Sequence, residues 1–80
     1  MNFLVADDDP ISRTIIVRLL QKWGHSVTPV ATGQEALHEL MKSNAPHIAI
    51  LDWIMPDGDG VEVCRQVRSA DLDFPPYLIV

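Results

Sequence analysis

Two short apolar runs in this chain each end at an acidic residue. Phe3 to Ala6 is followed by Asp7, and Ile48 to Leu51 is followed by Asp52. An uninterrupted apolar run of this length is typical of a strand that is buried on both faces of a sheet. Such strands are usually parallel and joined by helices, so the two runs favour an α/β fold.

The segment after the first run has the pattern of a helix. Asp9-Pro10 predicts a helix start, because the carboxylate can cap free amides and proline loses nothing at the first helical position. Gly24 predicts the end of this helix, and Trp23 is expected to pack there. The helix has an apolar face with helical spacing, made of Ile11, Ile15, Ile16, Leu19, Leu20 and Trp23.

The rest of the chain continues the alternation of strands and helices. Residues 25–31 predict an edge strand, because Pro29 lacks the amide hydrogen that a central strand needs. Thr32 and Glu35 have the spacing of a capping box, which predicts a second helix with Ala36, Leu37, Leu40 and Met41 facing inward. A third helix is expected from Gly60, with an apolar stripe of Val61, Cys64 and Val67. Residues 77–80 predict a fourth strand.

This order predicts one α/β domain over residues 1–80, with an open parallel sheet and right-handed crossovers. If the edge strand lies outside the first strand and the third strand lies on its other side, the strand order is 2-1-3-4. The reversal of strand order then falls between the first and third strands, where ligands bind in open parallel sheets. We therefore expect a site beyond the ends of these two strands.

Three carboxylates are predicted to meet at that point: Asp7, Asp8 and Asp52. They would repel one another by about 1 kcal/mol per pair at 4 Å in water, and by several times more near protein. A bound divalent cation removes this repulsion. Hard oxygen ligands favour Mg²⁺, which needs only one or two protein carboxylates.

Charge and composition restrict the partners of this chain. The formal net charge is −5 and the six basic residues are scattered, so we expect no binding to nucleic acid. No apolar run approaches the roughly 20 residues of a membrane span, and the N-terminus lacks the basic region of a secretion signal. Cys64 is the only cysteine, so no internal disulfide is possible. We expect a cytoplasmic protein.

Three segments of the sequence resemble the receiver domains of two-component signalling. They are residues 3–10 (Phe-Leu-Val-Ala-Asp-Asp-Asp-Pro), residues 32–37 (Thr-Gly-Gln-Glu-Ala-Leu) and residues 49–60 (Ala-Ile-Leu-Asp-Trp-Ile-Met-Pro-Asp-Gly-Asp-Gly). The resemblance implies a flavodoxin-like sheet in which Asp52 accepts a phosphoryl group from a sensor histidine kinase or phosphotransfer protein. It also implies a Mg²⁺ ion bound by Asp8 directly, by Asp7 partly through water, by Asp52, and by the backbone carbonyl of Ile54.

The chain departs from the family pattern at its C-terminal end. The resemblance implies a Ser or Thr hydroxyl after the fourth strand and a lysine after a fifth strand, and the 80 residues contain neither position. The fifth strand and last helices are also missing, so we expect metal binding to survive better than phosphorylation. Leu78 and Ile79 would lie on an exposed edge strand, which predicts a homodimer or strand-swapped association.

Other interpretations give the acidic residues different roles. In the first, an Asp-x-Asp motif makes Asp7 the nucleophile of a haloacid-dehalogenase-type phosphatase, although Pro10 and Ile11 do not continue that motif. In the second, the chain is an inactive fragment that serves only as a folding or dimerisation module. Residues 57–60 (Asp-Gly-Asp-Gly) resemble a calcium loop but lack its later ligands, so a tight turn is favoured. We expect a signalling phosphoacceptor and not an enzyme.

Overall fold

The computed structural model describes residues 1–52, 55, 60–72 and 75–80. Strands and helices alternate along the chain in the predicted order. The elements are β1 (Asn2–Ala6), α1 (Pro10–Lys22), β2 (Ser26–Val30), α2 (Gly33–Leu40), β3 (Ile48–Leu51), α3 (Gly60–Ser69) and β4 (Tyr77–Ile79). The predicted turn at residues 57–60 lies outside the described residues, except for Gly60.

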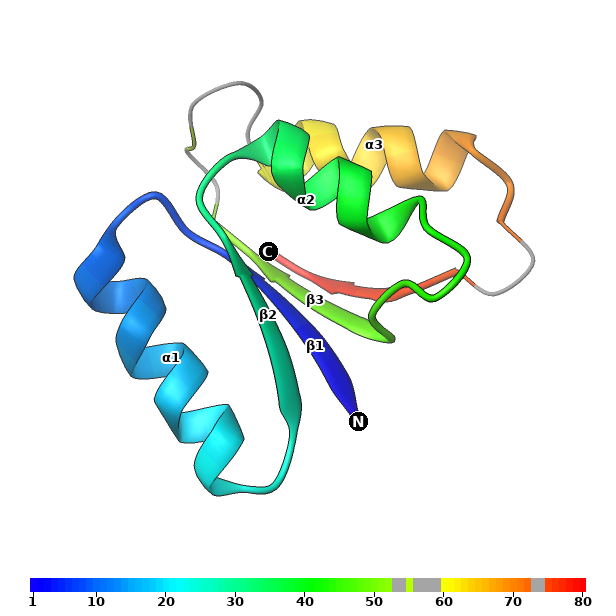
Figure 1. Cartoon of the computed structure of the whole chain (residues 1–80). Coiled ribbons are helices and arrows are strands. Elements are labelled where there is room, and N and C mark those ends of the chain that lie inside the picture. Colours follow the sequence, from blue (N-terminus) through cyan, green and yellow to red (C-terminus); the bar gives the residue numbers. More distant parts are fainter. Residues whose placement is uncertain (53–54, 56–59, 73–74) are drawn as a thin grey trace.

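The four strands form one parallel sheet in the order β2-β1-β3-β4, as predicted from the sequence. β1 is central and pairs with β2 on one side and β3 on the other, so that Ala6 lies opposite both Val30 and Leu51. In Figure 1, α1 lies on one side of this sheet, and α2 and α3 lie together on the other. β2, which contains Pro29, is at an edge of the sheet, where proline is tolerated.

The hydrophobic core lies between the sheet and the pair α2 and α3. Leu4 of β1 and Ala49 of β3 are fully buried on the face of the sheet that these helices cover. Leu40 of α2 and Val67 of α3 belong to the same cluster of buried residues. Side chains along a strand alternate between the two faces of a sheet, so Leu4 and Ala6 share this face. The other buried members of the core cluster are Val30, Ala36, Leu51, Met55 and Val63.

The N-terminal caps predicted for the first two helices are present. Asp9 is the N-terminal cap of α1, and its carboxylate accepts a hydrogen bond from the Ile11 amide at 3.2 Å. Thr32 caps α2, and its hydroxyl oxygen accepts a hydrogen bond from the Glu35 amide at 3.1 Å. Each cap pairs an amide that has no partner within its helix.

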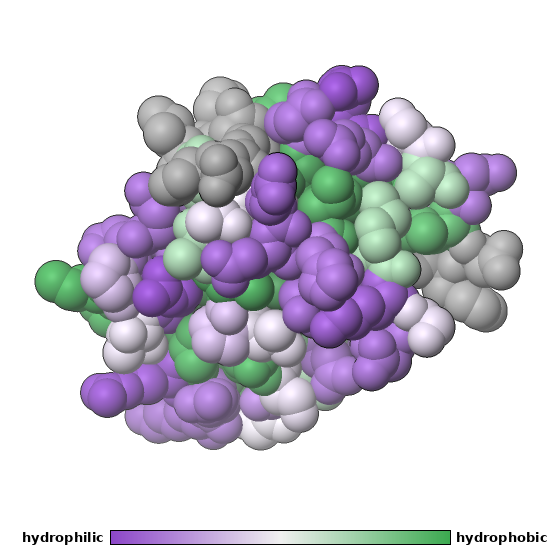
Figure 2. Space-filling model, turned by 45° about the horizontal axis from the view of Figure 1, so that its top comes forward, coloured by the Kyte–Doolittle hydropathy of each residue, from purple (hydrophilic) through white to green (hydrophobic). Residues whose placement is uncertain are grey.

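The apolar face predicted for α1 is correct for Ile16 and Leu20, which are half-buried and buried, and wrong for the other residues predicted to belong to it. Leu20 is the buried residue of this helix, whereas Ile11 is 71% exposed and Ile15 is 62% exposed. Trp23 is 64% exposed and does not pack at the helix end as expected. Ile11, Ile15 and Leu19 form a second apolar stripe beside the face that contacts the sheet, and Figure 2 shows hydrophobic surface at the left edge, where α1 lies.

Smaller differences of the same kind occur in α2 and α3. Met41 follows α2 and is exposed, whereas it was expected to face inward with Ala36 and Leu40. In α3 the exposed Val61 was predicted to belong to the apolar stripe, and Val63 is buried in its place. None of the helices in the described ranges has the length and apolar character that a bilayer span requires.

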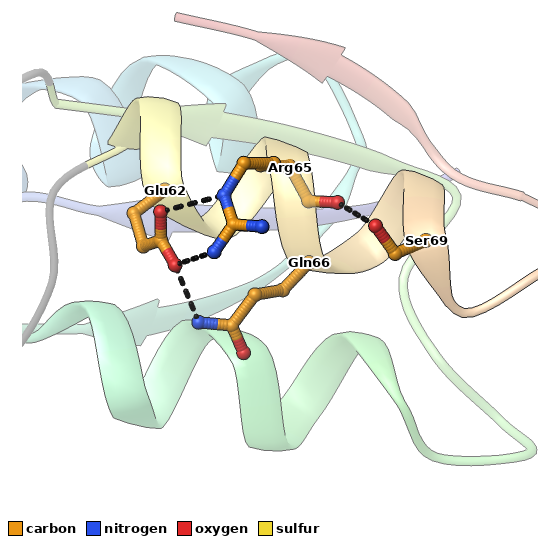
Figure 3. A network of polar contacts seen from close by, with 4 residues as sticks. All are labelled: Glu62, Arg65, Gln66 and Ser69. Carbon is orange, nitrogen blue, oxygen red and sulfur yellow. Dashed lines mark hydrogen bonds and ion pairs between the residues drawn. The ribbon is translucent and has the colours of Figure 1, made fainter.

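The outer surface of α3 carries a network of polar side chains (Figure 3). The Arg65 guanidinium donates hydrogen bonds to both carboxylate oxygens of Glu62, and the Gln66 amide donates to Oε1 of Glu62 at 3.0 Å. These contacts, with that from Arg65 the larger, lower the pKa of Glu62 to about 2. One turn further, the Ser69 hydroxyl donates to the carbonyl of Arg65 at 2.9 Å.

Candidate metal centre

The backbone hydrogen bonds of the sheet continue into the two acidic segments. The Asp7 amide donates to the carbonyl of Val30 at 3.2 Å, and the Asp52 amide donates to the carbonyl of Ala6 at 2.9 Å. Asp7 and Asp52 therefore each follow a strand end at the same edge of the sheet. In Figure 1 this edge is where β1 leads into α1.

The side chains of Asp7, Asp8 and Asp52 converge at this edge. Each offers one carboxylate oxygen, and these three atoms all lie within 4.8 Å of one another. Asp7 and Asp52 are half-buried and Asp8 is exposed. The fold thus brings together three of the four residues predicted for the metal site, whereas Ile54 lies outside the described residues.

Asp9 does not belong to this group. Its Oδ2 atom accepts a hydrogen bond from the Ser12 hydroxyl at 2.8 Å, and Oδ1 accepts from the Ile11 amide. The hydrogen bond from Ser12 is the main cause that lowers the pKa of Asp9, followed by the amide of Ile11. Its carboxylate is therefore engaged at the start of α1, in agreement with its predicted role as a cap.

The three converging carboxylates suit a small, hard cation. Mg²⁺ binds oxygen at about 2.1 Å, so two of its ligands lie at most about 4.2 Å apart. The three carboxylate oxygens all lie within 4.8 Å of one another, so they are close enough for a small ion to be reached directly or through a bound water molecule. An ion here would offset the mutual repulsion of the carboxylates and leave coordination positions for other oxygen ligands.

One residue next to this site was predicted only as a helix start. A Cβ atom added to Gly60 would lie 2.4 Å from the carbonyl oxygen of Asp52 and 3.2 Å from the Cβ of Leu51. The first turn of α3 thus lies directly against the backbone of Asp52. The sequence gives no signal of this contact, because it joins residues of two different elements.

Comparisons with known proteins agree on one family. The chain matches the response regulator receiver domain family over residues 3–80. Response regulator MprA of Mycolicibacterium vanbaalenii is 44% identical over 75 residues, which make up 94% of this chain and 32% of that protein. The chain therefore spans about a third of the length of this curated relative.

Solved structures show the same fold. The receiver domain of Francisella response regulator 1452 has a TM-score of 0.84 at 30% identity, covering 96% of this chain and 63% of that one. Response regulator TrrA of Thermotoga maritima was solved in complex with Mg²⁺-BeF. It has a TM-score of 0.80 at 33% identity, covering 88% of this chain and 60% of that one.

Proposed function

The chain belongs to the response regulator receiver family of two-component signalling, and we propose that Asp52 accepts a phosphoryl group beside a Mg²⁺ ion bound by Asp7 and Asp8. The observation that carries this proposal is the convergence of the three carboxylates at the ends of β1 and β3. The Mg²⁺-BeF complex of TrrA supports the same ion for this chain.

The proposed reaction needs few groups from the protein. An ionised oxygen of Asp52 forms a bond to phosphorus while the bond between phosphorus and the donor's leaving atom breaks, and the leaving group keeps the electron pair. The product is an acyl phosphate on Asp52. When bound, Mg²⁺ would supply positive charge between the carboxylates and the phosphoryl oxygens.

Asp7 and Asp52 have different roles in this proposal. The amide of Asp52 is held by Ala6 and that of Asp7 by Val30, so both side chains start from fixed backbone. Asp52 provides the nucleophile, whereas Asp7 and the exposed Asp8 orient the ion. We propose a phosphohistidine on a sensor kinase or a phosphotransfer protein as the donor, because membership of the family implies it.

Phosphorylation by a small donor tests the assignment. The protein is incubated with Mg²⁺ and acetyl phosphate, and the modified residue is located by mass spectrometry. We expect one acid-labile phosphoryl group in the wild type, none in Asp52→Asn, and a reduced amount in Asp7→Asn. Asp9→Asn is a matched control, because it changes an adjacent carboxylate outside the converging group, and it should be modified like the wild type.

The same experiment separates the alternative functions. Modification of Asp7 in place of Asp52 would support the phosphatase interpretation and contradict ours. Absence of modification, together with calorimetric binding of Mg²⁺ that is lost in Asp8→Asn, would support the inactive fragment. Absence of both modification and Mg²⁺ binding would contradict the proposal of a metal site as well.

Self-association stays a prediction. In this 80-residue chain β4 lies at an edge of the sheet, and Tyr77 and Ile79 are 72% and 47% exposed. We propose that two copies pair through this edge, which would bring the backbone groups that the edge strand exposes into hydrogen bonds. Sedimentation at micromolar concentration tests this, and a well-folded monomer would contradict it.

A further inference from the structure

The acidic segment after β1 receives a hydrogen bond from a basic side chain that the proposed function has not used. Nη1 of Arg13 donates to the backbone carbonyl oxygen of Asp7 at 2.7 Å, and this contact is partly buried. Arg13 lies in the first turns of α1, where its own amide donates to the carbonyl of Asp9 at 3.0 Å. The side chain thus reaches back from the helix to the residue that follows β1.

Asp7 is held at three of its polar groups. Its amide donates to Val30, and its Oδ1 atom accepts a hydrogen bond from the Asp9 amide at 2.9 Å. Its carbonyl oxygen accepts from Arg13. The donors and acceptors opposite Asp7 are backbone groups in the first two contacts, so the third is the one that a side-chain substitution can remove.

The hydrogen bond from Arg13 also restrains the orientation of the peptide unit that joins Asp7 to Asp8. The carbonyl of Asp7 and the amide of Asp8 belong to one planar peptide unit, so fixing the carbonyl oxygen fixes the direction in which the chain enters Asp8. Within the described residues, no hydrogen bond to the exposed carboxylate of Asp8 holds it in place. The orientation of the peptide unit is therefore the main restraint on this predicted ligand.

We propose that Arg13 is a positioning residue that holds the peptide between Asp7 and Asp8 in the orientation that Mg²⁺ binding requires. This inference rests on the proposed function, because it concerns the same ion. Arg13 acts through the carbonyl of Asp7 and does not contact the ion. Residues that orient the ligands of a metal ion commonly change its affinity by roughly 10- to 100-fold when they are replaced.

A purely electrostatic role for Arg13 predicts the opposite result. A guanidinium group close to a divalent cation repels it, so removing the charge would strengthen Mg²⁺ binding. Loss of the hydrogen bond to Asp7 would weaken binding instead. The direction of the change in affinity therefore separates the two roles.

Mg²⁺ affinity measured by calorimetry tests the proposal. The variants are Arg13→Met, which removes both the donor and the charge, and Arg13→Lys, which keeps the charge without the planar fork of donors. Arg18→Met is the matched control, because Arg18 is an exposed residue of the same helix and its loss changes the net charge equally. Thermal unfolding without Mg²⁺ is measured for each variant.

We expect Arg18→Met to bind Mg²⁺ like the wild type, Arg13→Met to bind it about tenfold more weakly, and Arg13→Lys to lie between them. A merely structural role would lower the melting temperature of Arg13→Met and leave its Mg²⁺ affinity unchanged. Binding by Arg13→Met that is as tight as that of Arg18→Met, or tighter, overturns the proposal. If Arg13→Met does not fold, the same comparison between Arg13→Lys and Arg18→Met decides.

Failure of the inference differs from failure of the proposed function. If the wild type binds Mg²⁺, Asp8→Asn does not, and Arg13→Met binds like Arg18→Met, only the role of Arg13 is wrong. If the wild type and Asp8→Asn both fail to bind Mg²⁺, the metal site itself is wrong, and the inference falls with it.

Discussion

The contact between Gly60 and Asp52 gives a prediction that combines stability and metal binding. An alanine Cβ at position 60 would lie 2.4 Å from the carbonyl oxygen of Asp52, and real Cβ atoms do not approach other atoms within 3.0 Å. The difference between these distances requires a shift of at least about 0.6 Å. The Cβ position is fixed by the backbone of residue 60, and the oxygen belongs to the backbone carbonyl of Asp52, so neither atom can rotate away as the end of a flexible side chain would.

The cost of Gly60→Ala follows from two opposing effects. Overpacking a close contact costs typically about 1–3 kcal/mol, whereas alanine is favoured over glycine in a helix by up to about 1 kcal/mol. We expect a net loss of about 1–2 kcal/mol. A domain of this size has a total stability of about 4–12 kcal/mol, so the variant stays folded but melts several degrees lower. Because Asp52 must move with its carbonyl, Mg²⁺ binding should weaken too.

Thermal unfolding followed by circular dichroism, together with calorimetric Mg²⁺ titration, measures both effects. Gly24→Ala is the matched control, because Gly24 has a φ of +87° and no atom within 4 Å of an added Cβ. It should be destabilised by about 1–2 kcal/mol through backbone strain, with unchanged Mg²⁺ affinity. If Gly60→Ala is as stable as the wild type and binds Mg²⁺ equally well, the reasoning from this contact is refuted.

Three further predictions concern the helices. Leu20→Ala should lower the free energy of unfolding in urea by about 2–3 kcal/mol, because it removes a buried side chain. Ile15→Ala, on the exposed stripe of the same helix, should change the free energy of unfolding by no more than about 0.5 kcal/mol. Equal losses in the two variants would contradict the orientation of α1. Thr32→Ala removes the cap of α2 and should cost about 1 kcal/mol in the same assay, while Thr32→Ser should restore most of it. Glu62 has a pKa of about 2 in the folded protein against an ordinary value of 4.5. Its contribution to stability is therefore complete above pH 4.5 and is lost as the pH falls toward 2, so the urea midpoint of the wild type should drop more steeply over this range than that of Glu62→Gln.

Much of the fold could be predicted from the sequence because its signals are local. Buried parallel strands appear as continuous apolar runs, and Asp9 and Thr32 mark helix starts through bonds to amides two or three residues away. The edge position of β2 followed from Pro29, and the strand order 2-1-3-4 followed on the condition that the third strand lies on the other side of the first. The convergence of Asp7, Asp8 and Asp52 followed in turn from that order.

The errors and omissions concern contacts between elements. Helical spacing shows that α1 has apolar residues on one half of its surface, but it does not distinguish the stripe of Ile11 and Ile15 from the stripe of Leu20. The hydrogen bond from the Arg13 side chain to the carbonyl of Asp7 depends on how α1 is oriented relative to the end of β1. The approach of Gly60 to Asp52 depends on the packing of α3, and no pattern in the sequence reports either distance.

The central position of β1 affects when the acidic group can assemble during folding. β1 is the first strand of this chain, but its partner β3 pairs through Phe3 and Ile48, which are 45 positions apart in the sequence. Closing so long a loop is slow compared with forming a helix or joining β1 to the nearer β2. An intermediate with only β1 and β2 paired would have Asp7 and Asp8 but not Asp52 beside them. A cation that needs all three would bind only the completed sheet, and by mass action it would select chains that have finished folding.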